Sequence, residues 1–236
     1  MKTYFCVLLM IMAMLCTACY YADADKQIDD KDIISETALL YTELSDFLNE
    51  EQISTYKMAQ YIYPLFNGVP DSINTLHLII ADADLETIQD YLADAERQTN
   101  RSIHNINGLN YCVCIGEYQR LSQFKELCLS VFTEEYWTEL NDTSWSVPQF
   151  VEINQKLYFV DISKGSIVGY NPTEYPDTYE VVCRTDTEIC FKVIGHYKSS
   201  TVESEYAIET RRFPIKLVLE DDGWRFSLFS DAALDD

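Results

Sequence analysis

The spacing of apolar positions predicts helices in the first half of the chain. The first is predicted from apolar residues at steps of three and four, namely Ile34, Ala38, Tyr41, Leu44 and Leu48. A second helical segment, over 55–66, ends before the breaker sequence 67–70 (NGVP). The apolar stretch over 76–81 predicts a strand. A helix then runs from the N-cap Asp84 to Arg97, and its inward positions are Leu85, Ile88, Leu92 and Ala95.

The middle of the chain predicts one hairpin and two capped helices. Asn107-Gly108 separates two strand-like segments, 103–106 and 109–115, and both turn residues tolerate positive φ. Ser122 and Thr133 can each cap a helix that follows.

From Phe150 onward the pattern is a succession of strands joined by polar turns. The predicted pairs are 150–153 with 157–162, 179–184 with 189–197, and 213–220 with 224–229. Gln155 stands in the first of these turns, where glycine would fit more comfortably. Helices followed by an antiparallel meander predict an α+β fold, with helices packed on one face of a curved antiparallel sheet.

The first 18 residues have the pattern of a signal peptide. Lys2 precedes an apolar stretch, 4–15, that is too short to span ~30 Å of hydrocarbon at ~1.5 Å per residue. The ending Thr17-Ala18-Cys19 resembles a bacterial lipoprotein signal, which implies a lipid on Cys19. The alternative is an ordinary signal peptide with an incidental cysteine. Both interpretations place the protein outside the cytoplasm, either anchored to the membrane or secreted.

The remaining chain divides into three predicted parts. Residues 19–32 form an acidic linker, 33–100 a helix-rich segment, and 101–236 the α+β domain. The 236 residues, of which 47% are hydrophobic, suit one globular domain or two small ones.

Charge excludes one class of partner. Lys and Arg number 17 against 39 Asp and Glu, so the formal net charge is −22. Nucleic acid would be repelled, because its binding depends on cationic side chains that neutralise phosphates. A basic protein partner fits this charge, and so does the simpler function of keeping a secreted monomer soluble.

Five cysteines follow Cys19, an odd number that cannot pair completely within one chain. A turn centred on 186–187 places Cys183 opposite Cys190, so a cross-strand disulfide is geometrically feasible, although free thiols are the favoured interpretation. Cys112 and Cys114 share one strand face without two further ligands at metal spacing, and are interpreted as buried hydrophobes. No metal or cofactor is predicted.

Catalytic motifs are missing from the sequence. It contains no G-x-S-x-G, no H-E-x-x-H and no glycine-rich phosphate loop. A Cys128–His196 pair is conceivable, but Cys128 shares a helix face with Phe124 and Leu127 and is interpreted as a core residue. The prediction is a protein without enzymatic activity.

Aromatic residues are abundant, with 17 Tyr, 11 Phe and three Trp. Most are expected in the core. Four are candidates for a pocket or a partner-facing surface, namely Tyr136, Trp137, Tyr158 and Trp224.

Several segments in order resemble one family of secreted Gram-positive proteins. They are Tyr111-Cys112-Val113, 127–136 (LCLSVFTEEY), 150–158 (FVEINQKLY) and 215–226 (IKLVLEDDGWRF). This succession resembles the IseA-like DL-endopeptidase inhibitors. The resemblance implies a non-catalytic domain that docks on peptidoglycan-cutting NlpC/P60 peptidases and blocks their cleft. The last segment is also similar to NTF2-like (cystatin-like) domains, which implies the alternative of a small-ligand-binding domain or enzyme.

Overall fold

The computed structural model describes residues 39–67, 69–98, 103–142, 147–160, 169–198 and 208–235, with the backbone alone over 94–98. Residues 38–236 form one compact unit, apart from residues 1–37. The predicted signal peptide, Cys19 and the acidic linker lie outside the described residues. Among the described helices, none has both the length and the apolar character needed to cross a membrane.

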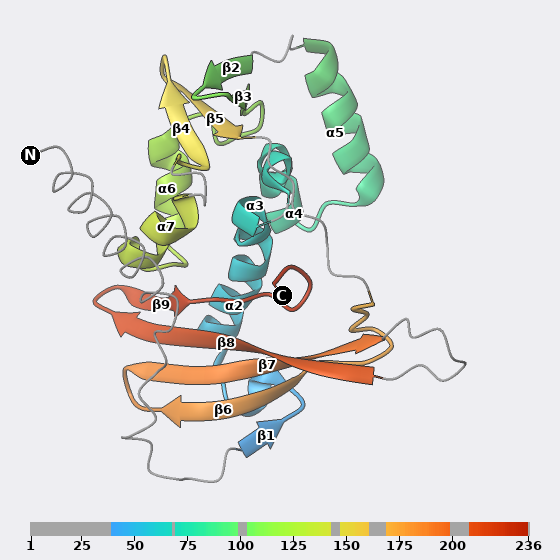
Figure 1. Ribbon diagram of the computed structural model, residues 1–236, viewed down its shortest axis with the longest axis vertical. Coiled ribbons are helices and arrows are strands. Elements are labelled where there is room, and N and C mark those ends of the chain that lie inside the picture. The colour runs from blue at the N-terminus through green and yellow to red at the C-terminus, as the bar shows by residue number, and fades with distance from the viewer. Residues whose placement is uncertain are drawn as a thin grey trace, which may run out of the picture. The chain divides into compact units, whose positions relative to one another are not determined.

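The fold class is α+β, as predicted, with two antiparallel sheets that share no strand (Figure 1). The five-stranded sheet has the order β1 (Leu39–Tyr41), β6 (Thr178–Arg184), β7 (Glu188–Lys198), β8 (Ile208–Glu220) and β9 (Gly223–Leu228). The four-stranded sheet has the order β2 (Ile103–Ile106), β3 (Leu109–Val113), β5 (Lys156–Val160) and β4 (Phe150–Ile153).

Helices connect and cover these sheets. The α-helices are α2 (Glu50–Ile62), α3 (Pro64–Asn67), α4 (Leu76–Ile80), α5 (Leu85–Gln98), α6 (Leu121–Leu129) and α7 (Glu134–Asn141). Two 3₁₀ turns are η1 (Leu44–Asp46) and η2 (Pro70–Asn74). Tyr56 of α2 lies over the five-stranded sheet, with ring centroids 6.2 Å from both Phe191 of β7 and Phe226 of β9.

The expected single meander is wrong, because the β4–β5 hairpin does not continue into β6. It pairs instead with the β2–β3 hairpin through β3 and β5, where Cys112 lies opposite Phe159. The side chains from Leu157 to Val160 are all buried, so both faces of β5 are covered. This strand lies inside its sheet, between β3 and β4.

The helix predicted from Ile34 to Leu48 is also wrong. Residues 39–41 form β1, which pairs with β6 through Leu39 and Val181. The helix begins later, after the N-cap Asn49. The Asn49 side chain accepts from the Gln52 backbone N–H, and the Gln52 side chain accepts from the Asn49 backbone N–H, both at 2.9 Å. A strand of the C-terminal sheet therefore comes from the segment predicted to be helix-rich, and the boundary expected near residue 100 lies inside the compact unit.

Two further predictions need correction. Residues 76–80 form α4 rather than a strand. Helix α5 has the predicted Asp84 cap, whose carboxylate accepts from the Thr87 N–H at 2.7 Å, but Leu85 at its start is 68% exposed rather than inward. The N-cap of α6 is Arg120, not Ser122, whereas Thr133 caps α7 as predicted.

Two hairpin turns use left-handed backbone. The predicted Asn107-Gly108 turn is confirmed, with φ values of 51° and 86°. In the β4–β5 turn, Asn154 and Gln155 have φ values of 50° and 64°, so a glutamine does hold a conformation that favours glycine. The Arg120 guanidinium donates to the Gln155 side chain at 3.3 Å, which anchors this turn to the start of α6.

The core is mainly aromatic. Its larger cluster joins the five-stranded sheet, the helices and one face of the four-stranded sheet, and its fully buried rings include Phe124, Phe132, Phe150, Phe191, Phe226 and Phe229. A smaller cluster on the four-stranded sheet consists of Tyr111, Val113, Tyr158 and Val160. Aromatic rings thus fill the interior that a pocket would occupy.

Candidate functional site

Two of the predicted aromatic candidates lie on α7 and are core residues. Tyr136 is 7% exposed, and its hydroxyl donates to the Phe229 carbonyl at 2.6 Å. Trp137 is 5% exposed, and it meets Phe66 and Phe124 edge-on at centroid distances of 5.6 and 5.8 Å. Both side chains hold α7 against the rest of the core.

The other two candidates lie elsewhere. Tyr158 of β5 is buried in the smaller cluster, with its ring edge-on to His104 at 5.0 Å. Trp224 of β9 is half-buried against the larger cluster. The four side chains therefore do not line one pocket, and of them Trp137 alone borders either of the two hollows described next.

The first hollow is a surface depression of about 250 Å³ beside α7, bordered by Trp137, Thr138, Asn141, Asp142 and Pro148. The side-chain amide of Asn141 is already hydrogen-bonded, because it accepts from the Phe150 N–H at 2.8 Å and donates to the Phe150 carbonyl at 3.3 Å. The depression thus offers a concave surface with an aromatic side chain rather than a reactive group.

The second hollow is enclosed and lies at one end of the five-stranded sheet. Its volume is about 10 Å³, and it is bordered by Tyr56, Gln60, Tyr170, Asp177 and Asp231, among others. A space of this size holds roughly one water molecule. It has no room for an organic ligand unless the C-terminal segment moves.

Two carboxylates at this hollow have perturbed protonation. Burial raises the pKa of both Asp177 and Asp231 above the ordinary aspartate range. The Tyr170 hydroxyl donates to Asp177 Oδ2 at 2.7 Å, whereas the buried Asp177 Oδ1 has no hydrogen-bond partner among the described residues. The two carboxylates therefore keep a proton to higher pH than an exposed aspartate does, and the hollow has room for about one water.

The C-terminal segment closes over this end of the sheet. The Tyr63 hydroxyl donates to Asp235 at 2.8 Å, and the Asp231 N–H donates to the same carboxylate oxygen at 2.8 Å. The Tyr197 hydroxyl donates to the Ala232 carbonyl. These bonds hold residues 231–235 against Tyr197 of β7 and against Tyr63, the residue that follows α2.

The three described cysteines outside the β6–β7 hairpin are core residues. Cys112, Cys114 and Cys128 are buried thiols outside the disulfide. Burial raises the thiol pKa of Cys114 and of Cys128, so neither is a thiolate near neutral pH. Their environment fits the predicted role as small core hydrophobes.

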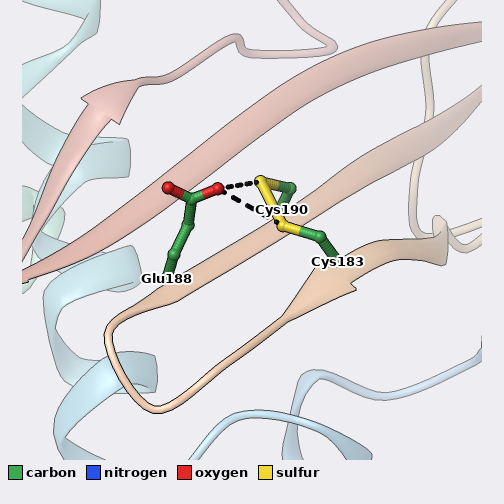
Figure 2. A group of neighbouring side chains, drawn as sticks. All are labelled: Cys183, Glu188 and Cys190. Atoms are coloured by element: carbon green, nitrogen blue, oxygen red, sulfur yellow. Dashed lines mark hydrogen bonds between the residues drawn. A yellow bond between two sulfur atoms is a disulfide. The ribbon is translucent and has the colours of Figure 1, made fainter. Parts of the chain in front are cut away.

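The β6–β7 hairpin places Cys183 directly opposite Cys190, with Cα atoms 4.8 Å apart, as the turn-centred register predicts. The structure joins them in a cross-strand disulfide, which corrects the expectation of free thiols (Figure 2). Glu188 extends alongside the two sulfurs, and its second carboxylate oxygen pairs with Lys216 Nζ at 2.9 Å.

Three carboxylates at these two places were not predicted from the sequence: Asp177, Glu188 and Asp231. A signal was present for Glu188, because residues 188 and 190 share one face of a strand. Asp177 and Asp231 follow no local pattern, and only the packing of the C-terminal segment brings them to one hollow.

Comparison with protein-family models finds no match for this chain, and comparison with curated proteins finds none either.

Proposed function

We propose that this protein is a non-catalytic binding protein of the cell envelope that recognises another protein through its surface. One observation carries the proposal: aromatic rings fill the described interior, and the hollow beside Asp177 and Asp231 holds only about one water. A partner is therefore met outside the core. The proposed location is extracytoplasmic, with Cys19 as the lipid-bearing residue of an exported chain.

The proposed partner class is a peptidoglycan DL-endopeptidase of the NlpC/P60 type, as the IseA-like resemblance implies, and the proposed action is inhibition. The net charge of −22 supports a basic member of this class. Opposite charge speeds docking and makes it sensitive to salt.

The depression beside Trp137 is the proposed contact surface. Concave surfaces with a buried aromatic residue are where interface energy concentrates. Exposed Glu134 and Glu135 stand at the start of the same helix and add negative charge next to it.

A binding and inhibition assay tests the proposal. The full chain is titrated into a basic NlpC/P60 peptidase during muropeptide hydrolysis, across a series of salt concentrations. We expect inhibition that weakens as salt rises. Thr138→Arg, which fills the depression, should weaken inhibition by about tenfold or more, a loss of roughly 1.4 kcal/mol. Ser54→Arg, on the exposed side of α2, is the matched control.

Two results would overturn the proposal. The first is an absence of binding to such peptidases even at low salt. The second is turnover of a substrate by the purified chain that a single side-chain change abolishes. Equal inhibition by the Thr138 variant and the wild type would reject the contact surface alone.

The alternative of an NTF2-like ligand-binding domain gains support from the raised pKa values of Asp177 and Asp231, since perturbed carboxylates gather at functional sites. It requires displacement of the C-terminal segment, which Tyr63, Tyr136 and Tyr197 hold by hydrogen bonds. The surface-binding proposal requires no such opening.

A further inference from the structure

The β6–β7 hairpin gathers two sulfur atoms and a carboxylate on one face. Cys183 and Cys190 are register partners on the two strands, and Glu188 precedes Cys190 by two residues. Side chains two residues apart in a strand project from the same face, so the Glu188 carboxylate lies beside the two sulfur atoms (Figure 2).

The three groups are close enough to share one ion. Glu188 Oε1 lies 3.3 Å from Cys190 Sγ and 3.6 Å from Cys183 Sγ. All three donor atoms lie within 4.8 Å of one another, and all three residues are half-buried. An ion from solution can reach them while part of its hydration is excluded.

Lys216 sets the direction of the carboxylate. It is the register partner of Cys190 on β8, and its ammonium group lies 2.9 Å from Glu188 Oε2. The other oxygen is left facing the sulfurs. Sulfurs in a disulfide carry no proton to donate, so stabilisation of the disulfide does not explain this orientation.

The disulfide is not the only link between the two strands. It links residues separated by seven positions, on strands that the β6–β7 ladder already pairs. A short loop restrains the unfolded chain less than a long one. The strands should therefore stay paired when the sulfur–sulfur bond opens.

We propose that Cys183, Cys190 and Glu188 form a zinc site when the disulfide is reduced. A thiol or phosphine reductant supplies two electrons and is itself oxidised, and two protons from water complete the two thiols. Zn²⁺ then displaces these two protons and binds both sulfurs and Glu188 Oε1, with a water as the fourth ligand. Two thiolates, one carboxylate, the zinc ion and the Lys216 ammonium together carry no net charge.

The donor set selects zinc over harder ions. Thiolates suit zinc, whereas calcium and magnesium take oxygen ligands. Tetrahedral zinc with Zn–S bonds of about 2.3 Å separates its two sulfurs by roughly 3.8 Å. The Cα separation of 4.8 Å accommodates that spacing after the side chains rotate.

Cobalt binding tests the proposal, because Co²⁺ replaces zinc and gives a thiolate-to-metal charge-transfer band only when thiolates bind it. The full chain is reduced with a phosphine under nitrogen, freed of reductant and titrated with Co²⁺, then with Zn²⁺. We expect one equivalent of cobalt with a thiolate charge-transfer band, which zinc removes. The oxidised chain, identical in sequence, should give no band.

Variants separate this site from the other cysteines. Cys183→Ser/Cys190→Ser should lose the band, whereas Cys112→Ser should keep it. Glu188→Gln should weaken zinc binding by about tenfold or more, and Lys216→Met by about tenfold, as loss of an orienting partner does. Circular dichroism of each reduced protein checks that the fold persists.

Three outcomes would overturn the proposal. They are a reduced wild type without a thiolate band, an equal band in the double serine variant, and zinc affinity that Glu188→Gln leaves unchanged. None of them bears on peptidase binding, so the proposed function is tested separately.

Discussion

The two sheets differ in which side chains of a strand are buried. Along β7 of the five-stranded sheet, Ile189, Phe191 and Val193 are at most 2% exposed, while the residues between them, Cys190 and Lys192, are only half-buried. Along β5 of the four-stranded sheet, the consecutive side chains Leu157 to Val160 are all at most 3% exposed. One sheet has a packed face and a solvated face, whereas β5 is packed on both.

This difference decides where chemistry can reside. In a strand with two packed faces every side chain is buried in the core, whereas in an alternating strand every second side chain reaches solvent and can bind or react. The disulfide, Glu188 and the Lys216 pair all lie on the alternating sheet. The four-stranded sheet packs Cys112, Phe150 and Phe159 into the larger cluster, and its other face carries the smaller cluster.

The largest expected effect comes from the packed face of the five-stranded sheet. Phe226 is fully buried and its ring lies 5.0 Å from Phe229. Phe226→Ala should lower the free energy of unfolding by about 3–5 kcal/mol, because it removes apolar burial and leaves a cavity. Urea denaturation measures the change.

The matched control for Phe226→Ala is Lys125→Met, which breaks an exposed ion pair with Glu134 and should cost less than about 1 kcal/mol. A loss of under 1 kcal/mol for Phe226→Ala would show that this cluster is not the main core.

A smaller effect is expected in the four-stranded sheet. The Tyr111 hydroxyl donates to the Pro148 carbonyl at 2.7 Å, and this bond ties β3 to the chain before β4. Tyr111→Phe keeps the ring and removes the bond, so the unfolding free energy should fall by about 1 kcal/mol. Thermal and urea unfolding report the change, and Tyr61→Phe, at a 41% exposed position, should show none.

The smallest effect is a change in pH dependence at the end of the five-stranded sheet. Asp177 and Asp231 have a raised pKa in the folded state because burial disfavours their charge. The folded protein therefore holds their protons more tightly than the unfolded chain does. The stability that they contribute is present below the unfolded pKa, and it is lost as pH rises through the folded pKa.

Asp177→Asn and Asp231→Asn should each flatten the fall of stability across that window, as measured by urea denaturation at successive pH values. Asp71→Asn, at an exposed position, serves as the control. An unchanged slope in both variants would mean that the carboxylates at the hollow are not desolvated.

Local signals explain which parts of the fold the sequence could predict. The Asn107-Gly108 turn, the β6–β7 turn and the Thr133 cap depend on a few adjacent residues, and all three are confirmed. Strand β1 was missed because its partner β6 lies about 140 residues away, and a three-residue strand has no periodicity of its own.

The same limit applies to the candidate site. The position of Cys183 opposite Cys190 follows from one turn and could be predicted, whereas the disulfide between them could not. Tyr136 and Trp137 were predicted on the correct helix, but the sequence does not show which neighbours surround them. Tyr136 donates to Phe229 in the core, whereas Trp137 packs on Phe66 and also borders the depression. Asp177 and Asp231 meet only in three dimensions.

Contacts between distant parts of the sequence constrain when the chain can fold. Strand β1 pairs with β6, and the hydroxyls of Tyr63 and Tyr136 donate to Asp235 and to the Phe229 carbonyl. Because β6 begins at residue 178, β1 stays without this strand neighbour until most of the described residues have been synthesised.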